Sequence, residues 1–100
     1  MSIKISKVFT RPDTNIPWHF EVLSGEEYAN QFAAVHAANC VSITKELVDN
    51  LNIKFTSEWV SNEAYQAYIQ DPILKKFWDS RDEYNTIMEI VAHATEITNV

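Results

Sequence analysis

Apolar and polar residues alternate in four stretches of the chain, and apolar residues recur at helical spacing in two others. The alternation predicts strands at residues 3–9, 41–48, 51–60 and 86–97. The helical spacing covers residues 25–38 and a second run that begins at 61–63 and continues beyond 71–72. The predicted order is therefore strand, helix, strand, strand, helix, strand.

This order predicts an α+β protein with a ferredoxin-like βαββαβ fold, in a single domain over residues 1–100. Right-handed crossovers place the four antiparallel strands in the spatial order 4-1-3-2. The same rule places both helices on one face of the sheet.

Two lysines interrupt the alternation. Ile3, Ile5 and Phe9 share one face of the first predicted strand, and Lys7 falls on the same face. A β-bulge would explain this misfit. Lys45 is also expected to point inward, which is one way to protect an edge strand from pairing with other chains.

The pattern also selects the loop of the central hairpin. A two-residue turn at 49–50 would mix the apolar and polar faces, whereas a three-residue loop at 49–51 keeps them apart. The longer loop predicts that Leu47 pairs with Ile53, Val41 with Trp59, Thr44 with Thr56, and Glu46 with Lys54.

Both predicted helices begin at capping residues. Ser24 and Glu27 match a capping box for the first helix. Ser61 or Asn62 caps the second, which Asp71 and Pro72 interrupt and restart. The apolar stripes are Tyr28, Phe32 and Val35 in the first helix, and Tyr65, Tyr68, Ile69, Ile73, Leu74, Phe77 and Trp78 in the second.

Residues 10–23 follow neither period over a long stretch. Turn-forming residues occupy positions 11–15. Trp18, Phe20 and Val22 then alternate with His19 and Glu21, which predicts an extended flap with a short strand.

Composition excludes several classes of partner. The chain has 14 acidic and 8 basic residues, a net charge of −6, and basic residues that are scattered apart from Lys75 and Lys76. Nucleic acids and anionic membranes bind clustered cations, so neither is expected as a partner. Cys40 is the single cysteine, and we see no signal peptide or membrane span. We therefore expect a cytoplasmic protein.

A family resemblance rests on residues 58–65, Glu-Trp-Val-Ser-Asn-Glu-Ala-Tyr, with Tyr68 and Asp71-Pro72. A strand that ends in Trp and enters a Ser-x-x-Ala-aromatic helix resembles the dimeric α+β barrel proteins, particularly the antibiotic-biosynthesis-monooxygenase-like group. Haem-degrading members use an Asn on the first strand with a Trp and a His on the second helix. Tyr68 and Trp78 stand at those two helix positions here, and the first strand has no Asn, so haem degradation is not implied.

The predicted fold leaves one face of the sheet without helices. Because its residues are too mixed for a purely solvated surface, we expect a homodimer that encloses a partly polar cavity there, as the resemblance also implies. The predicted residues of this face are Ser6, Val8, Thr44, Thr56, Glu58, Ile87, Glu89, Val91 and His93.

His93 and Glu58 are the candidate catalytic residues, because an imidazole can move a proton near neutral pH and a carboxylate can orient it. The alternative is that both are rim residues. Candidate ligand-binding residues are His19 and Trp18 of the flap, with Thr56, Val91 and Glu89 of the sheet. His36 borders the first helical stripe and is interpreted as a packed or surface histidine.

No metal or cofactor is expected. Glu89 and His93 would lie ~13 Å apart along a strand, and no H-x-H, HExxH or C-x-x-C motif occurs. The aromatic set Trp59, Trp78, Tyr65, Tyr68 and Phe77 is interpreted as core, with an aromatic ligand site as the alternative.

Two functions remain open. One is a homodimer that binds or turns over a small apolar or aromatic molecule, as a cofactor-independent monooxygenase-like enzyme or by proton transfer. The other is a structural or interaction protein whose second sheet face serves only dimerisation. An RNA-binding module is disfavoured by the acidic charge.

Overall fold

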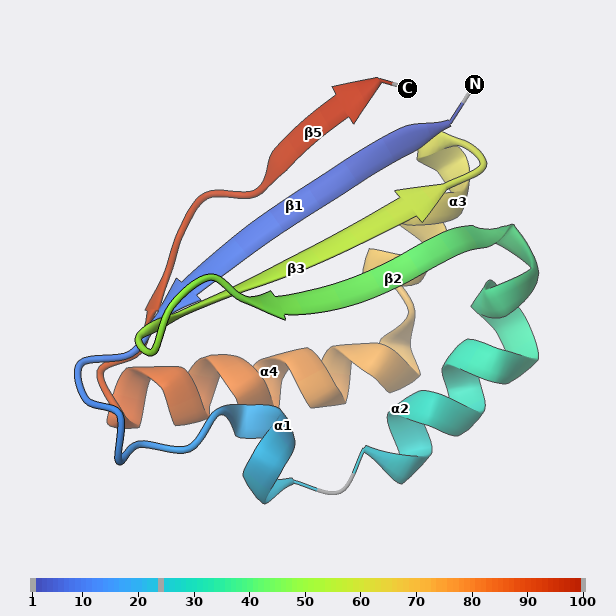
Figure 1. Ribbon diagram of the computed structural model, residues 1–100. Coiled ribbons are helices and arrows are strands. Elements are labelled where there is room, and N and C mark those ends of the chain that lie inside the picture. The colour runs from blue at the N-terminus through green and yellow to red at the C-terminus, as the bar shows by residue number, and fades with distance from the viewer. Residues whose placement is uncertain (1, 24, 100) are drawn as a thin grey trace.

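The computed structural model describes residues 2–23 and 25–99 of the chain (Figure 1). Its strands are β1 (Ile3–Thr10), β2 (Cys40–Leu47), β3 (Asn52–Trp59), β4 (Val91–Ala92) and β5 (Glu96–Asn99). Its helices are α1 (His19–Val22), α2 (Glu26–Gln31), α3 (Asn62–Ile69) and α4 (Pro72–Ile87). A π-helical turn (Phe32–His36) and a 3₁₀ turn (Ala37–Asn39) connect α2 to β2.

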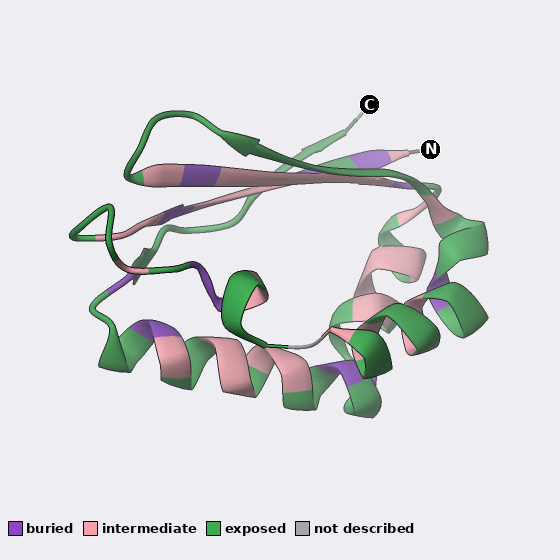
Figure 2. Cartoon of the chain, turned by 60° about the horizontal axis from the view of Figure 1, so that its bottom comes forward, coloured by how far each residue is buried: buried purple, intermediate pink, exposed green. Residues whose placement is uncertain are grey.

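The strands form one antiparallel sheet in the order β2-β3-β1-β4, and β5 also pairs with β1. The helices lie on one side of this sheet (Figures 1 and 2). The predicted α+β fold, strand order and one-sided helical layer are therefore confirmed. The last predicted strand is divided into the short strands β4 and β5.

The hairpin has the predicted register over most of its length. Leu47 pairs with Ile53, Glu46 with Lys54, and Thr44 with Thr56. The predicted pair of Val41 with Trp59 is wrong, because the register shifts between Cys40 and Ser42 and places Cys40 opposite Trp59. A bulge adds one residue to one strand, so Val41 is left without a partner there.

The bulge considered at Lys7 does not occur. β1 pairs with β3 without interruption, from Ile3 opposite Trp59 to Thr10 opposite Asn52. Lys7 therefore shares the helix-covered face with Ile5 and Phe9, which are buried. Lys7, which interrupts the apolar face of the first strand, therefore points into the layer between the sheet and the helices.

The caps of α3 and α4 confirm the predicted broken helix. The side chain of Ser61 accepts a hydrogen bond from the amide of Ala64 at 3.1 Å. Asp71 accepts from the amides of Ile73 and Leu74, and Pro72 takes the first helical position. These contacts satisfy amides that have no partner within their own helix.

The start of the last predicted strand is wrong, because α4 continues to Ile87. Leu74 and Asn85 are both buried and lie eleven positions apart, which is three helical turns. The helix ends where Glu89 takes a left-handed conformation with φ 59°, and Glu89 thus lies in a turn and not on a strand. Ile87 and Glu89 therefore do not belong to a strand face with Val91.

The predicted flap strand at residues 18–22 is also wrong. His19–Val22 form the short helix α1, because the carboxylate of Glu21 accepts a hydrogen bond from the backbone amide of Trp18 at 2.7 Å. An acidic residue three positions after a helix start is a known capping arrangement. Trp18 and His19 are buried, whereas Val22 is exposed.

The first predicted helix begins as α2 and then widens into the π-helical turn. The predicted cap Ser24 lies outside the described residues. Val35, predicted for the buried stripe, is 52% exposed, and His36 is buried in its place. A π turn holds one more residue than an α turn, so it shifts the stripe by one position.

Two clusters of buried residues make the core on the helix-covered face. One contains Phe9, Trp18, Ile53 and Ile90, and the other contains Ile3, Ile5 and Trp59. In Figure 2 the buried and half-buried parts of α4 face the sheet, while its outer side is exposed. No helix among the described residues has the length and apolar character that a membrane crossing requires.

Candidate functional site

A cavity of about 520 Å³ lies between the sheet and the helices. Its walls come from β1, β2 and β3 on one side and from α1, α3 and α4 on the other, with Tyr28 of α2. Ile5, Lys7 and Phe9 alternate along β1 and all line it, which places the cavity on the helix-covered face. Its volume lies within the range of small-molecule sites.

Three phenylalanine rings, two from the sheet and one from α1, form part of the cavity wall. Phe55 meets Phe9 edge to face at 5.7 Å between ring centroids and Phe20 at 6.1 Å. All three rings line the cavity. Edge-to-face contacts fix ring orientation, so this wall offers a defined apolar surface to a flat molecule.

Tyrosines line the cavity toward α3. The hydroxyls of Tyr28 and Tyr68 are 2.5 Å apart. Burial raises the pKa of Tyr68, and it also raises the pKa values of Tyr28 and Tyr65. These hydroxyls therefore remain protonated near neutral pH and add polar but uncharged groups to the wall.

The aromatic residues that the sequence assigned either to the core or to a ligand site divide between the two roles. Tyr65, Tyr68, Phe77 and Trp78 line the cavity. Trp59 is fully buried and belongs to the core. Helical spacing could not separate the two roles, because core and cavity lie on the same side of the helices.

His19 lies in the cavity wall and is 6% exposed. Its Nε2 is 3.3 Å from the hydroxyl of Ser80, and its ring stands edge-on to Phe77 at 5.0 Å. Burial lowers the pKa of His19, Arg81 lowers it further, and Asp82 opposes them. A neutral imidazole is thus favoured near pH 7, and it can accept a proton.

Lys7, Lys45 and Arg81 place cationic groups at the cavity. Lys45 Nζ lies over the ring of Phe20, 3.9 Å from its centroid. Lys7 Nζ is 5.7 Å and Arg81 Cζ is 5.3 Å from the centroid of Phe9. Burial, and then Arg81, lowers the pKa of Lys7, whereas Asp82 raises it.

The structure brings three of the predicted ligand-binding residues to this cavity and leaves the others elsewhere. Trp18 and His19 line it, and Thr56 borders it from β3, although the pairing of Thr56 with Ser6 points its side chain to the face without helices. Glu89 lies in the turn after α4, and Val91 is exposed on β4, where it pairs with Thr10. Neither Glu89 nor Val91 lines the cavity.

The candidate catalytic pair is not brought together within the chain. His93 Nε2 lies 2.8 Å from the hydroxyl of Thr10, and its amide donates to the carbonyl of Val8 at 2.9 Å. Glu58 lies opposite Lys4, toward the other end of β1. Lys4 and Thr10 lie six positions apart along β1, which corresponds to ~20 Å.

A buried pair that the sequence did not predict joins the first helical segment to α4. His36 Nε2 is 2.6 Å from Asp71 Oδ2, and Gln31 donates to the same oxygen at 2.8 Å. Hydrogen bonds from Gln31 and then His36 lower the pKa of Asp71 to about 2. Of the two interpretations of His36, as a packed or a surface histidine, the structure shows the packed one, and its partner Asp71 also caps α4.

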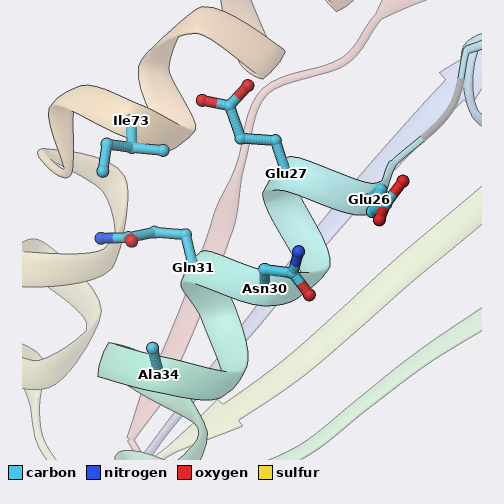
Figure 3. A pocket seen from close by; sticks show the side chains of 6 residues that line it. All are labelled: Glu26, Glu27, Asn30, Gln31, Ala34 and Ile73. Carbon is cyan, nitrogen blue, oxygen red and sulfur yellow. The ribbon is translucent and has the colours of Figure 1, made fainter.

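A second, more open depression lies on the outer side of the helices (Figure 3). It is lined by Glu26, Glu27, Asn30, Gln31, Ala34 and Ile73. Gln31 already donates a hydrogen bond to Asp71, and the remaining lining combines two acidic side chains with Asn30, Ala34 and the apolar Ile73. This surface offers no enclosed space, so the cavity is the better candidate site.

Among residues 2–23 and 25–99, no group of three or more His, Cys, Asp or Glu side chains is placed to hold a metal ion. Cys40 is half-buried and its thiol donates to the carbonyl of Ser42, while burial raises its pKa. A raised pKa disfavours the reactive thiolate, so Cys40 is a poor nucleophile.

Searches by sequence find neither a matching protein-family model nor a matching curated protein. The structure, in contrast, is similar to solved structures along its whole length. It matches Rv0793 from Mycobacterium tuberculosis with a TM-score of 0.63 and 14% identity, over 100% of this chain and 95% of that one.

Two further matches connect the fold to oxygenases. SnoaB, a cofactor-independent oxygenase from Streptomyces nogalater, matches with a TM-score of 0.52 and 12% identity, over 99% of this chain and 92% of that one. A candidate antibiotic biosynthesis monooxygenase from Deinococcus radiodurans matches with a TM-score of 0.54 and 12% identity, over 100% and 92%. The resemblance predicted from residues 58–72 is therefore confirmed at the level of the fold.

Proposed function

We propose that this protein binds a small, largely apolar or aromatic molecule in the cavity between its sheet and helices. The observation that carries the proposal is a partly open cavity of about 520 Å³ whose wall includes the rings of Phe9, Phe20 and Phe55. Apolar walls with a few polar groups at fixed places are typical of ligand sites. The earlier expectation placed the ligand on the opposite face, between two subunits.

Binding can be tested with N-phenyl-1-naphthylamine, an uncharged aromatic dye that fluoresces in apolar surroundings. Ile43 lines the cavity, so Ile43→Trp should fill part of it and weaken dye binding at least fivefold. Leu47→Trp is the matched control, because Leu47 lies on the same strand and is exposed outside the cavity. Equal binding by both variants would place the dye elsewhere, and no binding by the parent protein would contradict the proposal.

A second function is supported by His19 and by the similarity to SnoaB, which is described as a cofactor-independent oxygenase. In this proposal the neutral His19 takes a proton from an activated methylene of the bound molecule. The carbanion then reacts with dioxygen. One oxygen atom replaces the two methylene hydrogens as a carbonyl, and the other leaves as water.

This reaction can be followed as oxygen uptake with anthrone, whose methylene lies between two aryl rings. His19→Gln should reduce the rate by ~10²-fold or more if His19 is the base. His93→Ala tests the sequence-based alternative on the other face of the sheet. If the parent protein consumes no oxygen with anthrone, the oxygenase proposal fails for this class of methylene while the binding proposal stands.

The homodimer also remains a proposal. The face without helices carries polar pairs such as Lys4 with Glu58 and Glu46 with Lys54, which could match their counterparts in a second copy. Native mass spectrometry would report the number of subunits and any co-purified small molecule. A monomer without ligand would favour neither the dimer nor the binding proposal, and an empty dimer would favour the structural alternative.

A further inference from the structure

The charge of the cavity is opposite to that of the protein. The chain carries 14 acidic and 8 basic residues, with a net charge of −6. Three of the basic residues, Lys7, Lys45 and Arg81, line the cavity. No acidic residue lies among the described residues that line it. Residues drawn at random from an acidic chain would include more acidic than basic ones. The positive charge of the cavity lining is therefore a specific feature of this site.

The two lysines flank one aromatic ring on the sheet. Phe55 of β3 pairs with Lys45 of β2 on one side and with Lys7 of β1 on the other. Paired residues in an antiparallel sheet point to the same face, and two strand spacings separate the lysine Cα atoms by ~10 Å. The floor of the cavity is therefore an aromatic ring between two cations.

Arg81 adds a third cation from the helical side. It and Lys7 both lie near the ring of Phe9, so the two charged groups are no more than about 11 Å apart. The guanidinium also contacts Asp82 at 3.2 Å, a carboxylate whose side chain is 64% exposed. The positive charge of Arg81 is thus partly compensated by Asp82, which does not line the cavity.

Lys7 and Lys45 differ from Arg81 in having no carboxylate in direct contact, although Asp82 acts on Lys7 from a longer distance and raises its pKa. In the described part of the chain, no carboxylate lies within ion-pair distance of Lys7 or Lys45. The hydrogen-bond partner of Lys7 is the hydroxyl of Thr95, at 3.4 Å. A half-buried lysine without a direct ion pair is unfavourable in the empty protein, and a bound anion would relieve this cost.

We propose that the cavity selects a planar aromatic anion, such as an aromatic carboxylate, enolate or sulfonate, whose ring lies against Phe55 and whose negative charge is held by Lys7, with Lys45 and Arg81 nearby. This inference rests on the proposed binding function and specifies its ligand class. Charge-assisted contacts orient such a ligand, while the aromatic wall supplies the apolar contact.

Two dyes of nearly the same shape test the inference. 8-Anilinonaphthalene-1-sulfonate is N-phenyl-1-naphthylamine with an added sulfonate, and both report binding by fluorescence. The parent protein should bind the sulfonate at least tenfold more tightly than the uncharged dye. Lys7→Met should remove roughly tenfold of the sulfonate affinity and leave the affinity for the uncharged dye within about twofold. Lys45→Met should produce a smaller loss, because Lys45 is more exposed.

Two variants serve as controls. Lys54→Met removes a lysine from the opposite face of β3 and should change neither affinity. Lys7→Arg keeps the charge and should restore most of the sulfonate affinity, which a fold defect would not allow. Equal affinity for the two dyes, or an equal loss in Lys54→Met, would overturn the inference while leaving cavity binding intact. Failure of both dyes to bind would instead contradict the proposed function itself.

Discussion

Two regions of the helix–sheet layer treat buried polar groups in different ways. At the closed end, formed by Trp59, His36 and Asp71, each polar side chain has a close partner. Trp59 Nε1 donates to the hydroxyl of Ser57 at 3.0 Å, and His36 Nε2 lies 2.6 Å from Asp71 Oδ2. The closed end is built for stability.

The cavity contrasts with the closed end, although it lies in the same layer. Lys7 has a distant hydroxyl as its partner, His19 has Ser80 at 3.3 Å, and Trp18 Nε1 is buried without a partner among the described residues. Such groups cost free energy in the folded protein. The comparison teaches that burial alone does not identify a site, since His36 and His19 are equally buried. The two histidines differ in their hydrogen-bond partners, because His36 lies 2.6 Å from a carboxylate and His19 lies 3.3 Å from a hydroxyl.

The largest expected effect comes from Trp59→Ala at the closed end. Trp59 is 0% exposed, and its removal should lower the free energy of unfolding by about 3–5 kcal/mol. Ile69→Ala in the cavity wall is the matched change and should cost less than about 1.5 kcal/mol, because Ile69 is 37% exposed. Urea unfolding measures both. Similar losses would contradict the division into a closed end and an open cavity.

The next effect concerns acid stability. Because the pKa of Asp71 falls to about 2 in the folded protein, the unfolded chain binds more protons between that value and 3.8. The stability from this carboxylate is therefore complete above about pH 4 and is lost as the pH falls toward 2. Urea midpoints across this range should fall for the parent protein, and Asp71→Asn should flatten this part of the profile. An unchanged slope would show that Asp71 is not the group that titrates.

A smaller effect of opposite sign is expected at the cavity. Lys7→Met removes a charge that burial and Arg81 disfavour more than Asp82 supports it, and it should raise the free energy of unfolding at pH 7 by less than about 1 kcal/mol. The folded pKa of Lys7 lies below 10.5, so the gain should shrink as the pH rises toward 10.5. Lys54→Met provides the comparison in urea unfolding. A marked loss of stability in Lys7→Met would mean that Lys7 is already satisfied.

The smallest effect is assigned to His19. Its pKa is lowered from 6.5, so protonation opposes folding and stability should decrease as the pH falls from 6.5 through the folded pKa. His19→Gln should remove this slope. Two-dimensional NMR of the imidazole carbons would locate the titration directly, and a His19 pKa above 6.5 would contradict the cause assigned to its burial.

Alternation and capping residues predicted most of the fold because they depend on local sequence. The strand order, the hairpin register around Thr44 and the caps at Ser61 and Asp71 all follow from them. The start of the strand predicted from residue 86 is wrong. Met88 and Ile90 recur at every second position, as in a strand, but the helical phase of Leu74 and Asn85 carries α4 to Ile87. A short alternating run cannot overrule a longer helical one.

The candidate site was predicted only in part. His19 and Trp18 were selected because a flap could reach a ligand, and they do line the cavity. Lys7 and Lys45 were both noticed as residues that violate the apolar face, but were explained as a bulge and as edge protection. Their inward direction was the evidence for a polar site inside the layer, and the cross-strand pairing with Phe55 that unites them depends on tertiary structure.

The π-helical turn at Phe32–His36 has a consequence for comparing this chain with others. A relative with an uninterrupted α-helix here would have one residue fewer between the ring at Phe32 and the position that meets α4. A correct alignment must then open a gap inside a helix, where gaps are normally penalised. An alignment that avoids this gap would match His36 to the wrong column, and the histidine would look variable even in chains that keep its contact with the aspartate.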